Sequence, residues 1–321
     1  MKIGNNIPNK SIDFRSYNKL NPKTKLPVST SFYNDLATLK KSVQIIENSF
    51  PNGADILIYA GSNGEEAISV LSLLKNPEKY KIWSIDIFKE AIDYAKRGIY
   101  SVNRFHKDGF LVREKDLTED EKQAKSCFEK CVDEIEEPNF KLNNLTDIPY
   151  LLRLDCAGFI INKFFKLKSF VTDRITFAEG DIRDLKTFKT DKPIGGIFFR
   201  NALYHLTNND LRGVLGDGNK QDMEINRFQV LKDLTDSIGE KLPQNGIFVM
   251  GNHFQEHIYL ADKYTPSDKR VPIGNNSLML EPPHILALMQ NGKFKPCYTQ
   301  KIKSPDGKSL TVPLIWQKNC S

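Results

Sequence analysis

The sequence predicts an α/β fold with a doubly wound, mostly parallel seven-stranded sheet, a C-terminal antiparallel hairpin and a helical insertion. Short apolar runs alternate with amphipathic segments of helical spacing, which is typical of a parallel sheet covered on both faces. The last two apolar runs flank Pro305-Asp306-Gly307, and a turn of this kind predicts a hairpin. A long charged stretch with helical patterning interrupts the alternation and indicates the insertion.

Seven apolar runs are expected to form the strands. In chain order they are residues 55–60, 81–87, 174–182, 195–201, 245–252, 295–302 and 310–318. Apolar residues at helical spacing predict the intervening helices over residues 32–50, from Gly64 onward, 90–97, 222–240 and 284–290.

The chain divides at Pro51-Asn52-Gly53, a turn sequence that separates the first predicted helix from the first predicted strand. Residues 1–50 are expected to be an arm followed by a helix. Residues 51–321 are expected to form the α/β domain, and residues 104–172 an inserted helical subdomain within it.

Composition favours a soluble cytoplasmic protein. Of the 321 residues, 40% are hydrophobic and 27% charged, and no apolar run approaches the roughly 20 residues that span a bilayer. Five scattered cysteines, an odd number, favour a reducing compartment over a disulfide framework. The net charge of +6 is spread along the chain, so a nucleic-acid partner is not expected.

The turn after the first strand reads G-S-N-G-E-E, from Gly61 to Glu66. A dinucleotide site needs G-x-G-x-x-G, but Asn63 replaces the middle glycine, and two carboxylates would repel a pyrophosphate. S-adenosylmethionine (SAM) has no phosphate, and its ammonium, sulfonium and ribose diol all suit carboxylates. The turn therefore favours SAM, with Gly61, Ser62, Gly64, Glu65 and Glu66 as cofactor-binding residues.

Acidic residues end two further strands. Asp86 is placed to accept hydrogen bonds from the ribose hydroxyls, with Ile87 against the adenine. Asp181 could accept from the adenine amino group, while the Ile182 N–H donates to a ring nitrogen. Two simpler interpretations stay open: the glutamates are acids favoured at a helix N-terminus, and the aspartates are caps.

Four segments carry a family resemblance: AGSNGEEAISVLSLL, WSIDIFKEAIDYAKRGIYS, IFFRNALYHL and NGIFVMGNHFQE. In that order they resemble S-T-G-E-E-P-Y-S, D-I-x-x-x-x-L-x-x-A-R-x-G-I-Y, I-x-C-R-N-V-L-I-Y-F and G-G-x-L-x-x-G-H-S-E of the chemotaxis-receptor glutamate methyltransferase (CheR-type) family. The match covers about residues 28–103 and 170–257. It implies a class I, Rossmann-like SAM-dependent methyltransferase domain, consistent with the C-terminal hairpin.

The resemblance also implies roles for particular residues. Glu66, with Glu65, would bind the methionine ammonium, and Arg200 with Asn201 would line the methionine end and the acceptor side. Upstream, VSTSFYND resembles N-x-T-x-F-F-R-D: Thr30 matches and is taken as cofactor-binding, whereas Asn34 replaces the arginine.

The methyl acceptor is expected to be a protein carboxylate or a small molecule. A carboxylate needs no general base, whereas an amine, phenol or hydroxyl would use one, and His205 is the candidate. Arg200, Tyr204 and His205 are the predicted catalytic residues, although Tyr204 and His205 could simply open the helix that follows the strand. Two alternatives are a SAM-binding regulatory protein without transferase activity and, more weakly, an RNA methyltransferase.

One motif matches a zinc-peptidase pattern and is the remaining alternative, but the preferred interpretation has no metal. The stretch HFQEH, from His253 to His257, matches H-x-x-E-H. Zinc chemistry needs both imidazoles on one face of a helix, but this stretch directly follows a predicted strand. Cys127 and Cys131 lie four apart on a predicted helix and are interpreted as small apolar residues of that helix.

Overall fold

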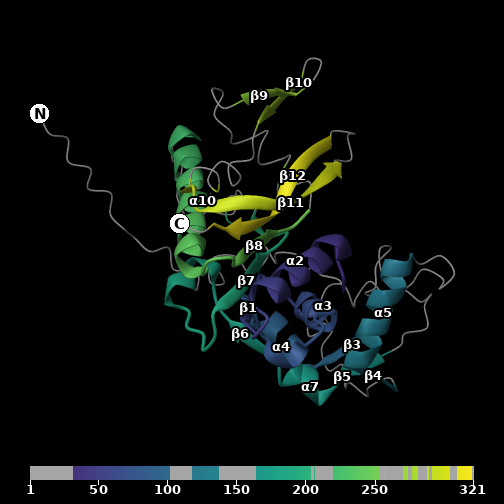
Figure 1. Cartoon of the computed structure of the whole chain (residues 1–321). Coiled ribbons are helices and arrows are strands. Elements are labelled where there is room, and N and C mark those ends of the chain that lie inside the picture. The colour runs from purple at the N-terminus through teal and green to yellow at the C-terminus, as the bar shows by residue number, and fades with distance from the viewer. Residues whose placement is uncertain are drawn as a thin grey trace, which may run out of the picture.

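The structure is a computed structural model that describes residues 32–101, 118–136, 164–203, 206, 220–252, 257, 270–273, 277–280, 288, 291–303 and 309–319. Its centre is a seven-stranded sheet, shown in Figure 1. The strands are β1 (Asp55–Tyr59), β2 (Lys81–Asp86), β6 (Ile175–Glu179), β7 (Ile194–Phe199), β8 (Ile247–Met250), β11 (Phe294–Lys303) and β12 (Ser309–Lys318).

The strand order confirms the predicted fold class. The order is β11-β12-β8-β7-β1-β2-β6. Strands β6, β2, β1, β7 and β8 pair in parallel, while β12 runs antiparallel to both β8 and β11. The last strand is therefore inserted between β8 and β11 as one arm of the C-terminal hairpin. A doubly wound sheet with this insertion is the class I, Rossmann-like methyltransferase fold.

Helices cover both faces of the sheet. One face carries α2 (Leu36–Ser49), α3 (Glu65–Leu73) and α4 (Lys89–Arg97), and the other carries the 3-10 helix η6 (Ile182–Thr187) and α10 (Lys220–Lys241). Helices α2, α3, α4 and α10 begin and end close to the predicted positions, whereas η6 was not predicted. A short 3-10 helix, η2 (Pro77–Lys79), precedes β2.

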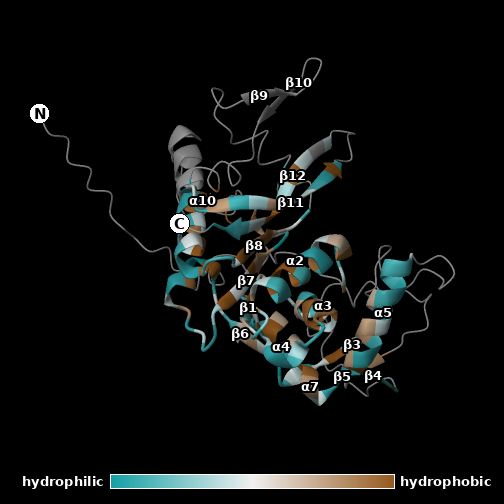
Figure 2. Ribbon diagram, in the orientation of Figure 1, coloured by the Kyte–Doolittle hydropathy of each residue, from teal (hydrophilic) through white to brown (hydrophobic). Residues whose placement is uncertain are grey.

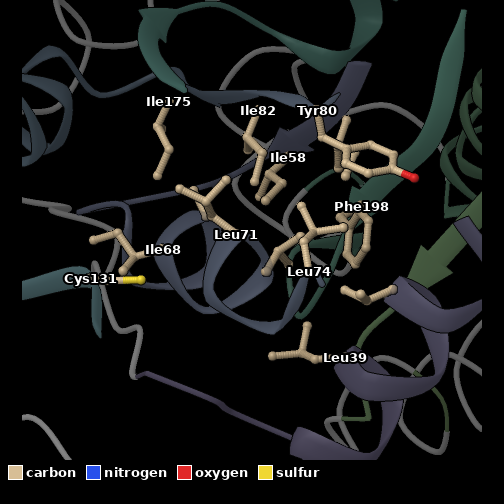
Figure 3. Close-up of a cluster of buried hydrophobic side chains, with 14 of the residues drawn as sticks. Leu39, Ile58, Ile68, Leu71, Leu74, Tyr80, Ile82, Cys131, Ile175 and Phe198 are labelled. Atoms are coloured by element: carbon tan, nitrogen blue, oxygen red, sulfur yellow. The ribbon is translucent and has the colours of Figure 1, made fainter. Parts of the chain in front are cut away.

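The period-two alternation of the strands divides the apolar side chains between two cores. In β1, Ile58 packs against α2 and α3, while Leu57 faces the layer of α10. In β8, Val249 joins the first core and Phe248 the second. Figure 2 shows the apolar residues concentrated on the central strands and the inner helix faces, and Figure 3 shows part of the first core. Burial on both faces explains why these strands are continuous apolar runs.

The described parts of residues 104–172 contain a helix and two strands of a small sheet. Helix α5 (Glu119–Cys131) confirms the helical pattern, and it starts at a capping box in which the Thr118 hydroxyl accepts from the Glu121 N–H and the Glu121 carboxylate accepts from the Thr118 N–H. Strands β3 (Ile99–Ser101), β5 (Phe164–Leu167) and β4 (Val132–Ile135) form an antiparallel sheet in that order, which the sequence did not predict.

The remaining described elements are the short helix α7 (Ser169–Thr172) and a two-stranded antiparallel sheet of β9 (Arg270–Ile273) and β10 (Ser277–Leu280). Apart from Leu288, the helix predicted at 284–290 lies outside the described residues, as does the arm over residues 1–31. None of the helices in the described ranges combines the length and apolar composition that crossing a membrane requires.

Candidate functional site

The predicted site residues lie at the carboxyl ends of β1, β2, β6 and β7, which are neighbours in the sheet. After β1 the chain builds β2 and β6 on one side of it, and later β7 and β8 on the other. The order therefore reverses between β1 and β7. In open α/β sheets, ligands bind outside the carboxyl ends of the strands at such a switch point.

The turn after β1 is tightly wound. The Gly61 N–H donates to the Ile85 carbonyl at 3.0 Å, and the Gly64 N–H donates to the Gly61 carbonyl at 2.9 Å. Ala60 and Ser62 adopt left-handed backbone angles, with φ of 53° and 50°. Such conformations cost of order 1–3 kcal/mol each and persist where the surroundings fix them, commonly at ligand sites.

The carboxylate of Asp86 connects this turn to the end of β2. Its Oδ2 accepts from the Ser62 N–H at 2.8 Å, and its Oδ1 accepts from the Phe88 N–H at 2.9 Å. Asp86 is 6% exposed, and burial raises the pKa of its carboxyl although the backbone N–H groups oppose the shift. Each carboxylate oxygen can accept a further bond. Asp86 is therefore a fixed acceptor beside the turn, with the half-buried Ile87 next to it.

A buried ion pair links the first turn of α3 to the end of β7. Arg200 Nη1 donates to Glu66 Oε2 at 2.8 Å, and Nη2 donates to the Asn34 carbonyl at 2.8 Å. Nη2 also lies 3.7 Å from Asp35 Oδ2, and the Arg200 side chain is 1% exposed. Burial raises the pKa of Glu66, and the guanidinium opposes that rise. One guanidinium thus lies between two carboxylates.

Asp35 and Gln300 belong to the same network, and sequence reasoning missed both. Asp35 caps α2, where its Oδ1 accepts from the Thr38 N–H at 3.4 Å and from Gln300 Nε2 at 3.0 Å. The cap was detectable in the sequence as an acid just before the first helical residues. Gln300 gave no local signal, because the hairpin strand β11 brings it to the network.

Asp181 lies in the turn after β6 and acts as the N-cap of η6. Its Oδ1 accepts from the Arg183 N–H and from Arg183 Nε, both at 2.9 Å, and its Oδ2 pairs with the other end of the guanidinium. The Gly180 N–H donates to the Asp86 carbonyl at 2.9 Å, so this turn adjoins the β2 end. Ile182 is buried in the second core. The capping interpretation therefore holds for Asp181, and its contact with adenine stays a prediction.

Asn201 follows β7 in a left-handed conformation, with φ of 55°. Its side chain packs directly against Gly251 at the end of β8, where an added Cβ would lie 1.9 Å from Asn201 Oδ1. Only glycine leaves room for this contact. Gly251 was thus missed as a site-supporting residue, although the Gly251-Asn252 pair after a strand was visible in the sequence.

Thr30, Tyr204, His205 and His253 lie outside the described residues, and their predicted roles stay predictions. His257 is buried, with Nε2 2.7 Å from the Gly251 carbonyl oxygen. Because a carbonyl only accepts, Nε2 carries the proton and is not free to bind a metal. Across the described ranges, no group of three or more His, Cys, Asp or Glu residues is placed to hold a metal ion.

Cys127 and Cys131 are free thiols on α5. Cys131 is buried in the first core, and burial raises the pKa of its thiol to about 11. A thiol held in its protonated form behaves as an apolar residue and not as a metal ligand. The packing supports the interpretation made from the sequence.

No protein-family model matches the chain, and no curated protein is significantly similar to it in sequence. The similar solved structures include a SAM-dependent methyltransferase from Methanosarcina mazei, at 10% identity, covering 86% of this chain and 98% of that chain with a TM-score of 0.37. The N-methyltransferase NodS from Bradyrhizobium japonicum is 10% identical, and the match covers 90% of this chain and 100% of that chain with a TM-score of 0.38. The glycopeptide N-methyltransferase MtfA, complexed with sinefungin, is 11% identical, and the match covers 90% of this chain and 86% of that chain with a TM-score of 0.36. The fold assignment rests on the strand order and not on these matches.

Proposed function

We propose that this chain is a SAM-dependent methyltransferase that binds SAM across the carboxyl ends of β1, β2, β6 and β7. The observation that carries the proposal is the buried carboxylate of Asp86 at the end of β2. The Ser62 and Phe88 N–H groups hold it in place beside the switch point of the sheet. A fixed acceptor at this position suits the two ribose hydroxyls of an adenosine ligand.

The charges along this edge suit SAM better than a nucleotide phosphate. In the ion pair of Glu66 and Arg200, the carboxylate is 15% exposed and faces the ligand's ammonium, while the guanidinium, 1% exposed, holds that carboxylate in place. Arg200 Nε and Ser62 Oγ are buried and have no hydrogen-bond partner within the described part of the chain. Such atoms are rare in folded proteins, and because they are buried they would bond to a ligand only after the surrounding side chains move on binding.

Bound SAM would supply a methyl group carried on a sulfonium, which an acceptor displaces in line. The protein's part is to position the acceptor and to exclude water. Arg200 and Asn201 lie at the end of β7 and would orient the methionine end. A carboxylate acceptor is already ionised at neutral pH, and His205 is the candidate base for any other acceptor.

The acceptor is proposed to be a protein carboxylate, as the CheR-type resemblance implies, or a small molecule. The cytoplasmic location expected from the scattered cysteines stays a prediction. The alternative function is a SAM-binding regulatory protein without transferase activity, which the replacement of the family's arginine by Asn34 favours. Conversion of SAM to S-adenosylhomocysteine together with methylation of any acceptor would exclude this alternative.

Calorimetric titration with S-adenosylhomocysteine tests the cofactor site. The wild type should bind, and Asp86→Ala should lose about 1.5–3 kcal/mol of binding free energy, because the ribose hydroxyls lose a charged acceptor. Asp93→Ala, which removes an exposed carboxylate from α4, is the control and should bind as the wild type does. Absence of binding by the wild type, or equal binding by Asp86→Ala, would contradict the proposal.

A further inference from the structure

Tyr100, in the short strand β3, bonds to the turn that follows β1. Its hydroxyl donates to the Asn63 carbonyl at 2.8 Å. Because Tyr100 is 1% exposed, no water can take over this hydrogen bond if the hydroxyl is removed. The same hydroxyl lies 3.2 Å from where a Cβ on Gly64 would be. Asn63 sits between Ser62, whose N–H bonds to Asp86, and Gly64, the N-cap of α3.

The ring of Tyr100 is held by aromatic contacts that lead into the insertion. It packs edge-on against Phe32, at 5.4 Å between centroids, and against Tyr94, at 5.9 Å. Phe32 in turn packs against Phe128 of α5, at 4.8 Å, and Phe128 against Phe165 of β5, at 5.6 Å. Tyr100 and Phe165 are also register partners in the β3–β5 pair.

We infer that Tyr100 is a positioning residue for the cofactor turn, through which the α5–β4–β5 unit sets the affinity for SAM. The inference rests on the proposed function. Ala60 and Ser62 hold left-handed conformations that persist only where the surroundings fix them. The bond from Tyr100 holds the carbonyl of the Asn63–Gly64 peptide, one residue after Ser62, and this restrains the turn so that the Ser62 N–H stays directed at Asp86. Tyr100 acts on the ligand only through this turn.

Tyr100→Phe removes the hydroxyl and keeps the ring. The chain offers a matched control in Tyr80→Phe: the Tyr80 hydroxyl donates to the Phe50 carbonyl at 2.9 Å, and Tyr80 is 2% exposed. Tyr80 precedes β2, so it lies at the end of the strand opposite Asp86. Each variant loses one hydroxyl-to-carbonyl bond of a buried tyrosine, the Tyr80 bond being partly buried, but only the Tyr100 bond reaches the turn.

The readouts are the Kd for S-adenosylhomocysteine and the hydrogen exchange of the Ser62 amide in the ligand-free protein. In Tyr100→Phe the Kd should rise about three- to tenfold, the net worth of one hydrogen bond, and the Ser62 amide should exchange faster. Tyr80→Phe should leave both quantities at their wild-type values, although both variants lower the melting temperature.

Wild-type binding and Ser62 exchange in Tyr100→Phe would overturn the inference. So would equal changes in the two variants, because they would show a general loss of stability. If the wild type itself does not bind S-adenosylhomocysteine, the proposed function fails, and the inference fails with it. If the wild type binds and Tyr100→Phe binds equally well, only the inference fails.

Discussion

Arg200 at the end of β7 and Glu66 in the first turn of α3 form a buried ion pair, with 2.8 Å between Nη1 and Oε2. The pair crosses the switch point of the sheet, because α3 follows β1 and β7 is the next strand in the other half. It therefore joins the two halves of the doubly wound fold at the edge where the ligand is proposed to bind. Asp35 adds a second carboxylate, 3.7 Å from the same guanidinium.

Removing the guanidinium should destabilise the fold strongly. In Arg200→Met the side chain keeps most of its length, but Glu66 and Asp35 are left as two buried carboxylates without their shared cation. Loss of one partner from a buried ion pair typically costs about 3–5 kcal/mol. Urea denaturation of the ligand-free protein should show a decrease in the free energy of unfolding of that size.

Lys232→Met provides the comparison, since Lys232 pairs with Asp236 on α10 while 44% of its side chain is exposed. Its loss should change the free energy of unfolding by about 0.5 kcal/mol or less. Similar effects of the two substitutions would show that the Arg200 network does not stabilise the fold.

The sequence was sufficient for the central sheet because its strands are buried on both faces. Runs such as Ile56–Tyr59 and Ile247–Met250 are continuously apolar, and the turns between them contain glycine or polar residues. The β3–β5–β4 sheet was missed for the opposite reason. Strands β3 and β5 have three and four residues, and they pair across a separation of more than 60 positions, so neither has a local period to detect.

The site residues, like the strands, divide into those that the sequence predicted and those that it missed. Asp86, Glu66 and Arg200 were predicted because the carboxyl ends of parallel strands meet at one edge, so a strand-end residue can be placed from its position alone. Gln300 and Tyr100 were missed because each reaches the site through a tertiary contact, one from the hairpin and one from the short strand β3. No pattern in their own segments indicates those contacts.

The raised pKa of Glu66 gives a pH dependence with a definite sign. An acid whose pKa is higher in the folded state than in the unfolded state opposes folding when it is ionised. That penalty is present at neutral pH. It disappears as the pH falls through the raised folded pKa toward the ordinary glutamate pKa of 4.5. Wild-type stability relative to Glu66→Gln should therefore rise as the pH is lowered from 7 toward 4.5.

Urea unfolding of both proteins at several pH values measures this difference. Glutamine keeps an oxygen that can accept from Arg200 and removes only the titrating charge, so the two curves isolate the Glu66 carboxyl. A difference that is flat with pH, or that falls as the pH is lowered, would contradict the raised pKa.

Cys131 should react slowly with alkylating agents. Its thiol pKa is raised from 9.0 to about 11 by burial, which lowers the thiolate fraction at neutral pH about a hundredfold, and the thiolate is the reacting form. Peptide mapping after iodoacetamide treatment should show Cys131 labelled much more slowly in the folded protein than in urea. Fast labelling of folded protein would mean a low-pKa thiol and would reopen a metal or redox role for the Cys127–Cys131 pair.

Gly251→Ala should destabilise the protein at the edge of the site. The added Cβ would lie 1.9 Å from Asn201 Oδ1 and 2.4 Å from the Asn201 backbone nitrogen. The side chain alone cannot relieve the clash, so the backbone after β7 has to move. Overpacking of this kind costs about 1–3 kcal/mol, and we expect a decrease in the free energy of unfolding toward the upper end of that range. Because Asn201 follows Arg200, the affinity for S-adenosylhomocysteine should fall as well.

Gly292→Ala is the control that distinguishes the effect of crowding by an added Cβ from the effect of backbone strain. Gly292 has a positive φ of 69°, but an added Cβ there has no heavy atom within 4 Å, so only the backbone strain of about 1–2 kcal/mol applies. It lies before β11, away from the carboxyl ends of β1 and β2, and ligand affinity should stay at the wild-type value. Equal losses of stability and affinity in the two variants would show that the contact of Gly251 with Asn201 does not shape the site.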